Sequence, residues 1–450
     1  MMASSNYNLM EESYKSGVQP HALRNRLCTL AMVVLLFLGL KWAGGNLDGY
    51  KIQLINLVAI NAILAVSLNF IYGFSGMFSL GHAGFMAIGA YVSALCILTP
   101  AQKEMIWLLE PIWGPLANLH TSFFVSVLLG GAAAALFSLI IALPVMRLGG
   151  DYLGIATLGF AEIIRVLFTN LVPLTNGAIG LRGIPSYANL WWNYAWLVIT
   201  LFIIMSILKS NFGNVLKSIR DDEIAAKTMG INTTAYRTMA FCLGGFFAGV
   251  GGALMGSLIT TIEPKMFNFL MTFNILLIVV AGGLGSVTGS VVGAAAITLL
   301  LEWLRIIEYP TNIDMTAFQN SLALQVGVAF GAIALRFFSL KAFVTKHGNK
   351  FSVKKMAWIL STLICEIIAI VILLEWLGLE VIPEVLRIPG IPGMRMLLFS
   401  ILLILIILFR RQGLMGTREF SWNSFFSFIS WLKGHITKGR PKAGLGRKEA

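Results

Sequence analysis

Glu162 and Arg165 are the two residues whose types and spacing most directly suggest binding chemistry. They lie three positions apart in an otherwise apolar stretch, so one face of a helix would carry both. Ionised groups inside a membrane are costly and mark functional sites by default. The carboxylate could bind the amino group of a zwitterionic solute, and the guanidinium could bind its carboxylate. The alternative is a structural ion pair near the cytoplasmic interface, where an arginine side chain can reach the headgroups.

Other reactive side chains give weaker signals. His82 lies in a glycine-rich stretch, where a lone histidine more often forms a packing hydrogen bond than relays protons or binds a ligand. The four cysteines form no CxxC pair, so they fit buried apolar positions and predict no metal site. The chain contains no HExxH, GxSxG or GxxxxGK(S/T) motif. It is therefore not predicted to be an enzyme or to bind ATP or another cofactor itself.

A long polar segment, Asn211 to Arg237, separates two apolar stretches and reads NFGNVLKSIRDDEIAAKTMGINTTAYR. We expect a helix from Leu216 to Met229, with Gly230 as its stop. Three- and four-residue spacing would bring three of its residues near one face, namely Ile219, Glu223 and Ala226. Small alanines would let a partner approach closely, and neighbouring charges could fix its register. The alternative is a solvated connector whose charges only orient the chain.

The elements that must position these residues are membrane helices. Of the 450 residues, 57% are hydrophobic and only 12% charged, whereas soluble domains carry about a quarter charged residues. Many apolar runs approach the roughly 20 residues that a spanning helix needs. Runs such as Met396 to Phe409 do not alternate as strands of a membrane β-barrel would. The predicted fold is an all-α polytopic membrane protein.

We expect about 10–12 transmembrane helices, some of them short or broken. The predicted spans are 27–44, 52–73, 78–98, 120–146, 151–172, 193–209, 238–262, 268–283, 286–304, 318–338, 356–376 and 396–409. With the N-terminus inside, most lysines and arginines fall on the cytoplasmic side, whereas acidic residues show no such bias. Both termini are therefore predicted to be cytoplasmic, and the net charge of +13 reflects orientation, with no nucleic-acid partner expected.

Two glycine-rich stretches interrupt the apolar pattern, one within Tyr72 to Gly89 and one at Ala281 to Gly289. Each contains a G-x-x-G sequence, at 73–76 and 282–285, which suggests a weak internal repeat. Helix breaks are tolerated in a membrane where they line a cavity or pack into protein, and in transporters they point to the solute path. The alternative is tight helix packing by small residues.

Taken in order, several segments resemble the permease subunits of branched-chain amino-acid ABC importers, the Liv type, a family that includes urea-importer permeases. The resemblance covers residues 52–304 and resumes near the C-terminus. Its segments are Asn61–Gly89, Tyr152–Leu167, Leu174–Gly183, Ser218–Ile231, Phe246–Gly256, Ala281–Gly293 and Arg395–Gly416.

The resemblance implies a subunit of the bacterial inner membrane that imports branched-chain amino acids. Its expected partners are cytoplasmic ATP-binding subunits, a second homologous permease subunit and an external solute-binding protein. ABC permeases share a cytoplasmic EAAxxxG loop that docks on the ATP-binding subunit. The residues expected to couple to that subunit are Arg220, Asp221, Asp222, Glu223, Ala225, Ala226 and Gly230, with Glu223 one position earlier than the motif requires. The residues expected along the translocation path are Asn69, Gly76, Ser79, His82, Glu162, Arg165, Asn176, Gly283 and Gly285.

The chain departs from the family pattern in two places. About ninety residues, Ile306 to Met394, intervene before the final helix, and the turn LTNGAIG replaces the usual LTNGPNG. The predicted organisation is a cytoplasmic N-terminal segment (1–26), a transmembrane core (27–304) containing the polar segment (211–237), an insert with two extra helices (305–394), a final helix (395–416) and a basic cytoplasmic tail (417–450). Aromatic and basic residues in that tail suit contact with membrane lipid.

Other functions remain open at this point. Urea or an amide could be the solute instead of a branched-chain amino acid. An ion-coupled secondary transporter would need intramembrane acids, for which Glu162, Glu366 and Glu375 qualify. An intramembrane enzyme has no supporting motif.

Overall fold

The computed structural model describes residues 22–107, 110–146, 152–305, 311–314, 385–388, 400–401, 413, 415–416 and 419. The chain forms two compact units, one made of Met1–Leu300 with Ile401–Ala450 and the other of Leu301–Ser400.

Nine apolar helices build the described part of the first unit. They are α2 (Ala22–Asn46), α3 (Gly49–Asn69), α4 (His82–Ile97), α7 (Phe123–Val145), α8 (Tyr152–Asn170), α10 (Leu190–Lys209), α13 (Thr233–Ile259), α14 (Phe269–Gly282) and α15 (Val287–Arg305), the last of which ends in the second unit. Seven are long and apolar enough to cross a membrane, whereas α4 and α14 are shorter. The predicted all-helical polytopic fold is confirmed for this part of the chain. The last three predicted spans lie almost entirely outside the described residues.

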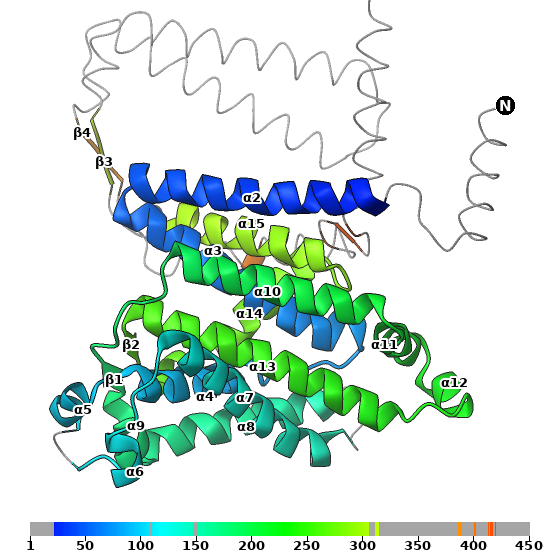
Figure 1. Ribbon diagram of the computed structural model, residues 1–450, viewed down its shortest axis with the longest axis horizontal. Coiled ribbons are helices and arrows are strands. Elements are labelled where there is room, and N and C mark those ends of the chain that lie inside the picture. Colours follow the sequence, from blue (N-terminus) through cyan, green and yellow to red (C-terminus); the bar gives the residue numbers. More distant parts are fainter. Residues whose placement is uncertain are drawn as a thin grey trace, which may run out of the picture. The chain divides into compact units, whose positions relative to one another are not determined.

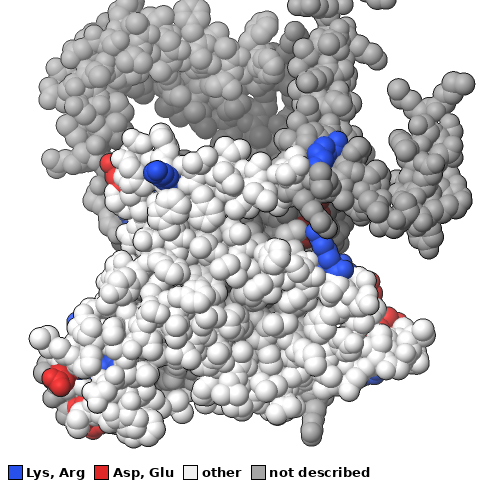
Figure 2. Space-filling model, viewed as in Figure 1, with Lys and Arg blue, Asp and Glu red and all other residues white. Residues whose placement is uncertain are grey.

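The long apolar helices of the first unit run in similar directions (Figure 1). The polar helices α11 (Asn211–Asp221) and α12 (Glu223–Thr228) lie at one end of this bundle. At the other end lie α5 (Pro100–Ile106), α6 (Gly114–Ala117), α9 (Val172–Thr175) and the antiparallel strands β1 (Leu181–Arg182) and β2 (Thr261–Ile262). The 3₁₀ turn η2 (Gly177–Ile179) packs against α9, and the 3₁₀ turn η3 (Pro264–Met266) packs against η2. In Figure 2 the middle of the visible face is almost free of charged residues, which gather toward its edges. This distribution suits helices surrounded by lipid.

Close contacts between glycines hold the centre of the bundle, where α13 packs against α4 and α7. A Cβ atom on Gly89 would overlap the carbonyl oxygen of Gly249, and one on Gly130 would lie 2.7 Å from the carbonyl oxygen of Gly89. Only glycine lets three helix backbones approach this closely. Tight packing by small residues, the simpler of the two explanations for the glycine content, therefore accounts for these positions.

The two G-x-x-G stretches are breaks between helices. Helix α3 continues as one π-helical segment, η1 (Phe70–Phe74), and the chain is then non-helical until α4 begins at His82. Helix α14 ends at Gly282 and α15 begins at Val287. Because α4 and α14 have only 16 and 14 residues, neither reaches the length of about 20 that a full crossing needs.

The described part of the second unit contains a two-stranded antiparallel sheet, which the sequence did not predict. Strand β3 (Thr311–Asp314) pairs with β4 (Val385–Ile388), with Thr311 opposite Ile388. The two extra helices predicted for the insert lie outside the described residues.

Candidate functional site

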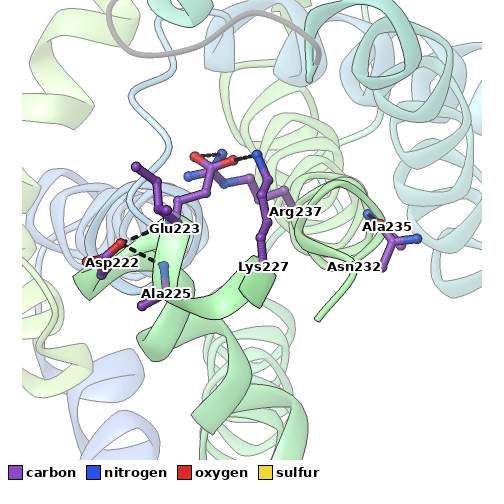
Figure 3. Close-up of polar contacts among 8 residues, drawn as sticks. Asp222, Glu223, Ala225, Lys227, Asn232, Ala235 and Arg237 are labelled. Atoms are coloured by element: carbon purple, nitrogen blue, oxygen red, sulfur yellow. Dashed lines mark hydrogen bonds and ion pairs between the residues drawn. The ribbon is translucent and has the colours of Figure 1, made fainter. Parts of the chain in front are cut away.

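The polar segment forms two helices, α11 and α12, and not the single helix expected from Leu216 to Met229. The break lies at Asp222, whose backbone is extended at φ −155° and ψ 110°. Its carboxylate accepts hydrogen bonds from the backbone N–H groups of Ile224 (2.9 Å) and Ala225 (3.0 Å), as Figure 3 shows for Ala225. Aspartate is a favoured N-cap because it satisfies such free donors. The single-helix prediction was wrong because Asp222 caps a second helix.

Helix α12 buries one side and exposes the other. Ala226 is buried, and so is Ile219 on α11. Two large apolar side chains lie in the open, Ile224 at 77% exposure and Met229 at 82%. We call the exposed residues of this helix and its end the α12 face; they are Ile224, Ala225, Lys227, Thr228 and Met229.

Gly230 ends α12, as predicted. Its backbone is left-handed at φ +82°, where other residues are strained. Its N–H donates to the carbonyl oxygen of Lys227 (3.0 Å), and the N–H of Ile231 donates to that of Ala226 (3.2 Å). These two bonds form a Schellman motif, which fixes the direction in which the chain leaves the helix.

Glu223 forms ion pairs within the chain. Its carboxylate binds the ammonium group of Lys227 (2.8 Å) and the guanidinium group of Arg237 (2.6 Å), which lies in the first turns of α13 (Figure 3). The hydrogen bond from Lys227, with that from Arg237, lowers the pKa of the Glu223 carboxyl. Glu223 therefore attaches α12 to α13, and this use of the acid does not depend on its position in the general motif.

Arg220 points from α11 toward the first helix break. Its Nη1 donates to the carbonyl oxygen of Gly73 (3.0 Å), while Asp221 Oδ1 accepts from Nε (3.0 Å) and Nη2 (2.9 Å). Gly76 is left-handed at φ +72°, and a Cβ there would lie 3.1 Å from Arg220 Cγ. The guanidinium of Arg220 is thus used inside the chain, not as a charge free for a partner.

Asn69 joins the first break to the second. Its Oδ1 accepts from the backbone N–H of Gly285 (2.9 Å), and its Nδ2 donates to the carbonyl oxygen of Ser286 (2.8 Å) and to Ser290 Oγ (2.7 Å). A Cβ on Gly73 would overlap the backbone nitrogen of Gly285. The two G-x-x-G sequences therefore contact each other directly. We call residues 73–76 and 283–286, with Asn69, the break junction.

Met415 and Glu419 also contact this junction and the helix that follows it. The N–H of Met415 donates to the carbonyl oxygen of Gly282 (3.1 Å). The Glu419 carboxylate accepts from the backbone N–H groups of Val287 (2.6 Å) and Thr288 (3.2 Å), at the start of α15. A carboxylate at a helix N-terminus satisfies free donors and complements the helix dipole. Glu419 thus caps α15 although it lies more than a hundred residues further along the chain.

His82 and Ser79 are buried next to the first break. His82 Nε2 lies 2.8 Å from Ser67 Oγ, and that hydroxyl donates to the carbonyl oxygen of Leu64 (2.8 Å), so Nε2 donates to Ser67. His82 Nδ1 has no hydrogen-bond partner among the described residues. Ser79 Oγ accepts weakly from the N–H of Gly81 (3.4 Å). His82 makes the packing hydrogen bond that its surroundings favour.

Glu162 and Arg165 form an ion pair of 2.7 Å with both side chains partly exposed. They lie in the second half of α8, whereas Thr157, in the first half, accepts a hydrogen bond from the N–H of Leu80. Phe168, one turn beyond Arg165, contacts Tyr91 near the far end of α4. The pair therefore lies in the half of α8 that is farther from α12. The alternative from the sequence, a structural pair near the side of the membrane that carries the polar segment, does not fit this position.

Asn176 lies between α9 and η2, at the end of the bundle opposite α12. It is buried and left-handed at φ 58°, and its Nδ2 donates to the carbonyl oxygen of Gly180 (3.0 Å). The structure thus brings together Asn69, Gly76, Gly283 and Gly285 with Arg220. It does not bring Glu162, Arg165 or Asn176 to the same place.

The family model described as "Branched-chain amino acid transport system / permease component" matches residues 50–328, more than half of the chain. The chain belongs to this permease family. It is a multi-pass inner-membrane permease. The match includes both helix breaks, α11 and α12.

Curated relatives of this permease carry transport names. The chain is 28% identical to the high-affinity branched-chain amino acid transport permease LivM of Salmonella typhimurium and 29% identical to LivM of Escherichia coli, in each case over 61% of this chain and 68% of the relative. It is 29% identical to the nucleoside ABC transporter permease NupC of Lactococcus lactis, over 41% of this chain and 60% of the relative. No solved structure matches the permease.

Sequence reasoning missed several residues of the permease site. Ile224 and Met229 could have been noticed as apolar residues in a polar segment, and Asn232 as an N-cap signal, since its Oδ1 accepts from the N–H of Ala235 (3.1 Å; Figure 3). No local pattern marks Glu419, because its partners lie more than a hundred residues away.

Proposed function

We propose that this permease is the membrane subunit of an ATP-driven importer for branched-chain amino acids. Its family and its LivM relatives support the solute class. The observation that carries the energy source is the α12 face, where Ile224 and Met229 are exposed in an otherwise polar segment. Large apolar side chains exposed among charges are typical of protein contacts. The sequence has no phosphate-binding loop, so a partner must bind ATP.

The remaining partners are proposed on the same basis. The chain is similar both to LivM and, at 24% identity, to LivH of Escherichia coli. Two permeases in one organism's transport system suggest that this chain also pairs with a second, homologous subunit. A solute-binding protein would then load the pair at the end that carries β1 and β2, and the ATP-binding subunits would dock at α12.

Two alternatives concern the solute and the energy source. The similarity to NupC makes a nucleoside a specific competitor, and urea or an amide remains open from the sequence. An ion-coupled carrier would need a free intramembrane acid. Among the described residues, Glu162 is paired with Arg165 and so is a poor candidate, while Glu366 and Glu375 lie outside them.

Uptake assays test the proposal. A strain is compared with and without this subunit for uptake of labelled leucine, with excess unlabelled valine, uridine or urea as competitor. We expect uptake that needs the subunit, is blocked by valine and stops when ATP is depleted. Inhibition by uridine or urea but not valine would replace the solute, and uptake that survives ATP depletion but collapses with the ion gradient would overturn the ATP-driven mechanism.

A further inference from the structure

Among the described residues, Arg220 makes the only hydrogen bond or ion pair between α11 and the break junction, and its partner there is Gly73. Its guanidinium donates through Nη1 to the carbonyl oxygen of Gly73. Through Nε and Nη2 it donates to the carboxylate of Asp221. A Cβ atom built on Gly285 would lie 3.2 Å from Arg220 Nη1, so the guanidinium group also lies against the second break. One side chain therefore touches both breaks.

Helices α11 and α12 differ in how firmly they are held. Leu216 and Ile219 of α11 are fully buried. Helix α12 has six residues, exposes most of its surface and is tied to the bundle by Ala226 and by the ion pair of Glu223 with Arg237. The extended residue Asp222 separates the two helices and directly follows Asp221. A displacement of α12 would therefore first move Asp221 and, with it, the guanidinium group of Arg220 that donates to its carboxylate.

We propose that Arg220 is a positioning residue that conveys movement of α12 to both helix breaks. With α12 in the position described, the guanidinium binds the carbonyl oxygen of Gly73 and lies beside Gly285. When a partner displaces α12, Asp221 moves with it. The hydrogen bond from Arg220 to Gly73 is then stretched or broken, and the two breaks separate. This inference rests on the proposed function, because it needs a partner that moves α12.

Such coupling requires an element with two arrangements that both sites bias, not mere proximity. The two breaks are the element proposed here, because the regular helices stop there and Gly76, Gly283 and Gly285 have positive φ. Each break keeps a helix-type hydrogen bond at its edge, from the N–H of Gly76 to Tyr72 (3.1 Å) and from the N–H of Gly283 to Val279 (2.9 Å). Asn69 ties the second break to the end of α3, so separation at Gly73 would be felt at Gly285 and Ser286.

The test measures transport and ATP hydrolysis together, on the permease co-purified with its ATP-binding subunits and partner permease and placed in liposomes. The variants are Arg220→Gln, Arg220→Lys and Asp221→Asn. Lys217→Gln is the matched control, since it also removes a positive charge from α11. The readout is the number of solute molecules moved per ATP hydrolysed, beside the amount of assembled complex.

We expect Arg220→Gln to assemble and to keep its ATP hydrolysis, while transport per ATP falls about tenfold or more, as loss of a charge-assisted hydrogen bond allows. Arg220→Lys should restore part of the ratio, because an ammonium group can still reach one carbonyl. Asp221→Asn should give an intermediate loss, and Lys217→Gln should match the wild type.

An unchanged ratio in Arg220→Gln would overturn the proposal, as would equal losses of hydrolysis and transport in an assembled complex, since that result indicates a docking role only. If Arg220→Gln does not assemble, unchanged ratios in both Arg220→Lys and Asp221→Asn overturn it. Failure of the proposed function looks different, because the wild-type complex would then show no ATP-dependent transport at all.

Discussion

Asn69 Oδ1 accepts a hydrogen bond of 2.9 Å from the backbone N–H of Gly285, although the two residues are 216 positions apart in the chain. The Nδ2 group of Asn69 makes two further donations, one to the carbonyl oxygen of Ser286 in the second break and one to Ser290 Oγ in α15. The side chain at the end of one helix thus takes the place of helix hydrogen bonds that the other break has lost.

Replacing Asn69 with alanine should weaken the junction. Because the buried N–H of Gly285 would lose its acceptor, we expect the free energy of unfolding to fall by about 1–3 kcal/mol and uptake to fall with it. Asn61→Ala is the control, since Asn61 makes one hydrogen bond, to Thr298, and is only half-buried. Thermal unfolding in detergent compares the two. Equal losses would show that Asn69 has no special place in the structure.

The contact between Gly89 and Gly249 should not tolerate a methyl group. Gly89→Ala would force α4 and α13 apart, and overpacking of this kind costs about 1–3 kcal/mol. Gly159→Ala is a matched control, because Gly159 is also helical but has no atom within 4 Å of a Cβ built on it. We expect Gly159→Ala to be as stable as the wild type or more so. Membrane yield and unfolding temperature measure both, and a fully stable Gly89→Ala would contradict the packing described.

The α12 face should be required for binding the ATP-binding subunit. We expect the double variant Ile224→Ser with Met229→Ser to insert normally but to lose most of the co-purified subunit, since exposed apolar anchors dominate such contacts. Met105→Ser alters an equally exposed methionine on α5, at the other end of the bundle, and should leave co-purification unchanged. Full binding by the double variant would place the partner elsewhere.

Gly230 offers a test of backbone geometry. Gly230→Val should abolish uptake while the protein remains in the membrane, because a β-branched residue fits poorly at positive φ and would open the end of α12. Gly230→Asn should retain much of the uptake, since asparagine tolerates the left-handed region. Protein level in the membrane is measured alongside. Normal uptake by the valine variant would remove the need for this helix end.

The ion pairs of Glu223 predict a pH dependence. Its pKa is lowered in the folded protein, so its contribution is present above the ordinary value of 4.5 and is lost as the pH falls through the lowered value. At pH 7 we expect Glu223→Gln to cost about 0.2–1 kcal/mol, the range for exposed pairs. Unfolding measured between pH 7 and pH 3 should show the gap close at low pH. A gap that is independent of pH would mean that packing, not charge, causes it.

Hydropathy and glycine content predicted much of this fold because both act locally. Nine apolar helices follow from the apolar runs, although two of them, α4 and α14, are shorter than a full span. The two breaks follow from G-x-x-G, and the end of α12 follows from Gly230. The division at Asp222 was missed because an aspartate between two helix-prone stretches is equally compatible with one helix or with a cap. The inward direction of Arg220 was missed because its acceptor is a backbone carbonyl 147 positions away, which no side-chain pattern reveals.

The cap that Glu419 provides to α15 also has a consequence for biosynthesis. The ribosome makes α15 more than a hundred residues before it makes the acid that satisfies the helix's first donors. A nascent chain can therefore insert every described helix and still lack a finished junction. A chain truncated before Glu419 would leave the first N–H groups of α15 without this acceptor, so the junction is completed only after more than a hundred further residues have been translated.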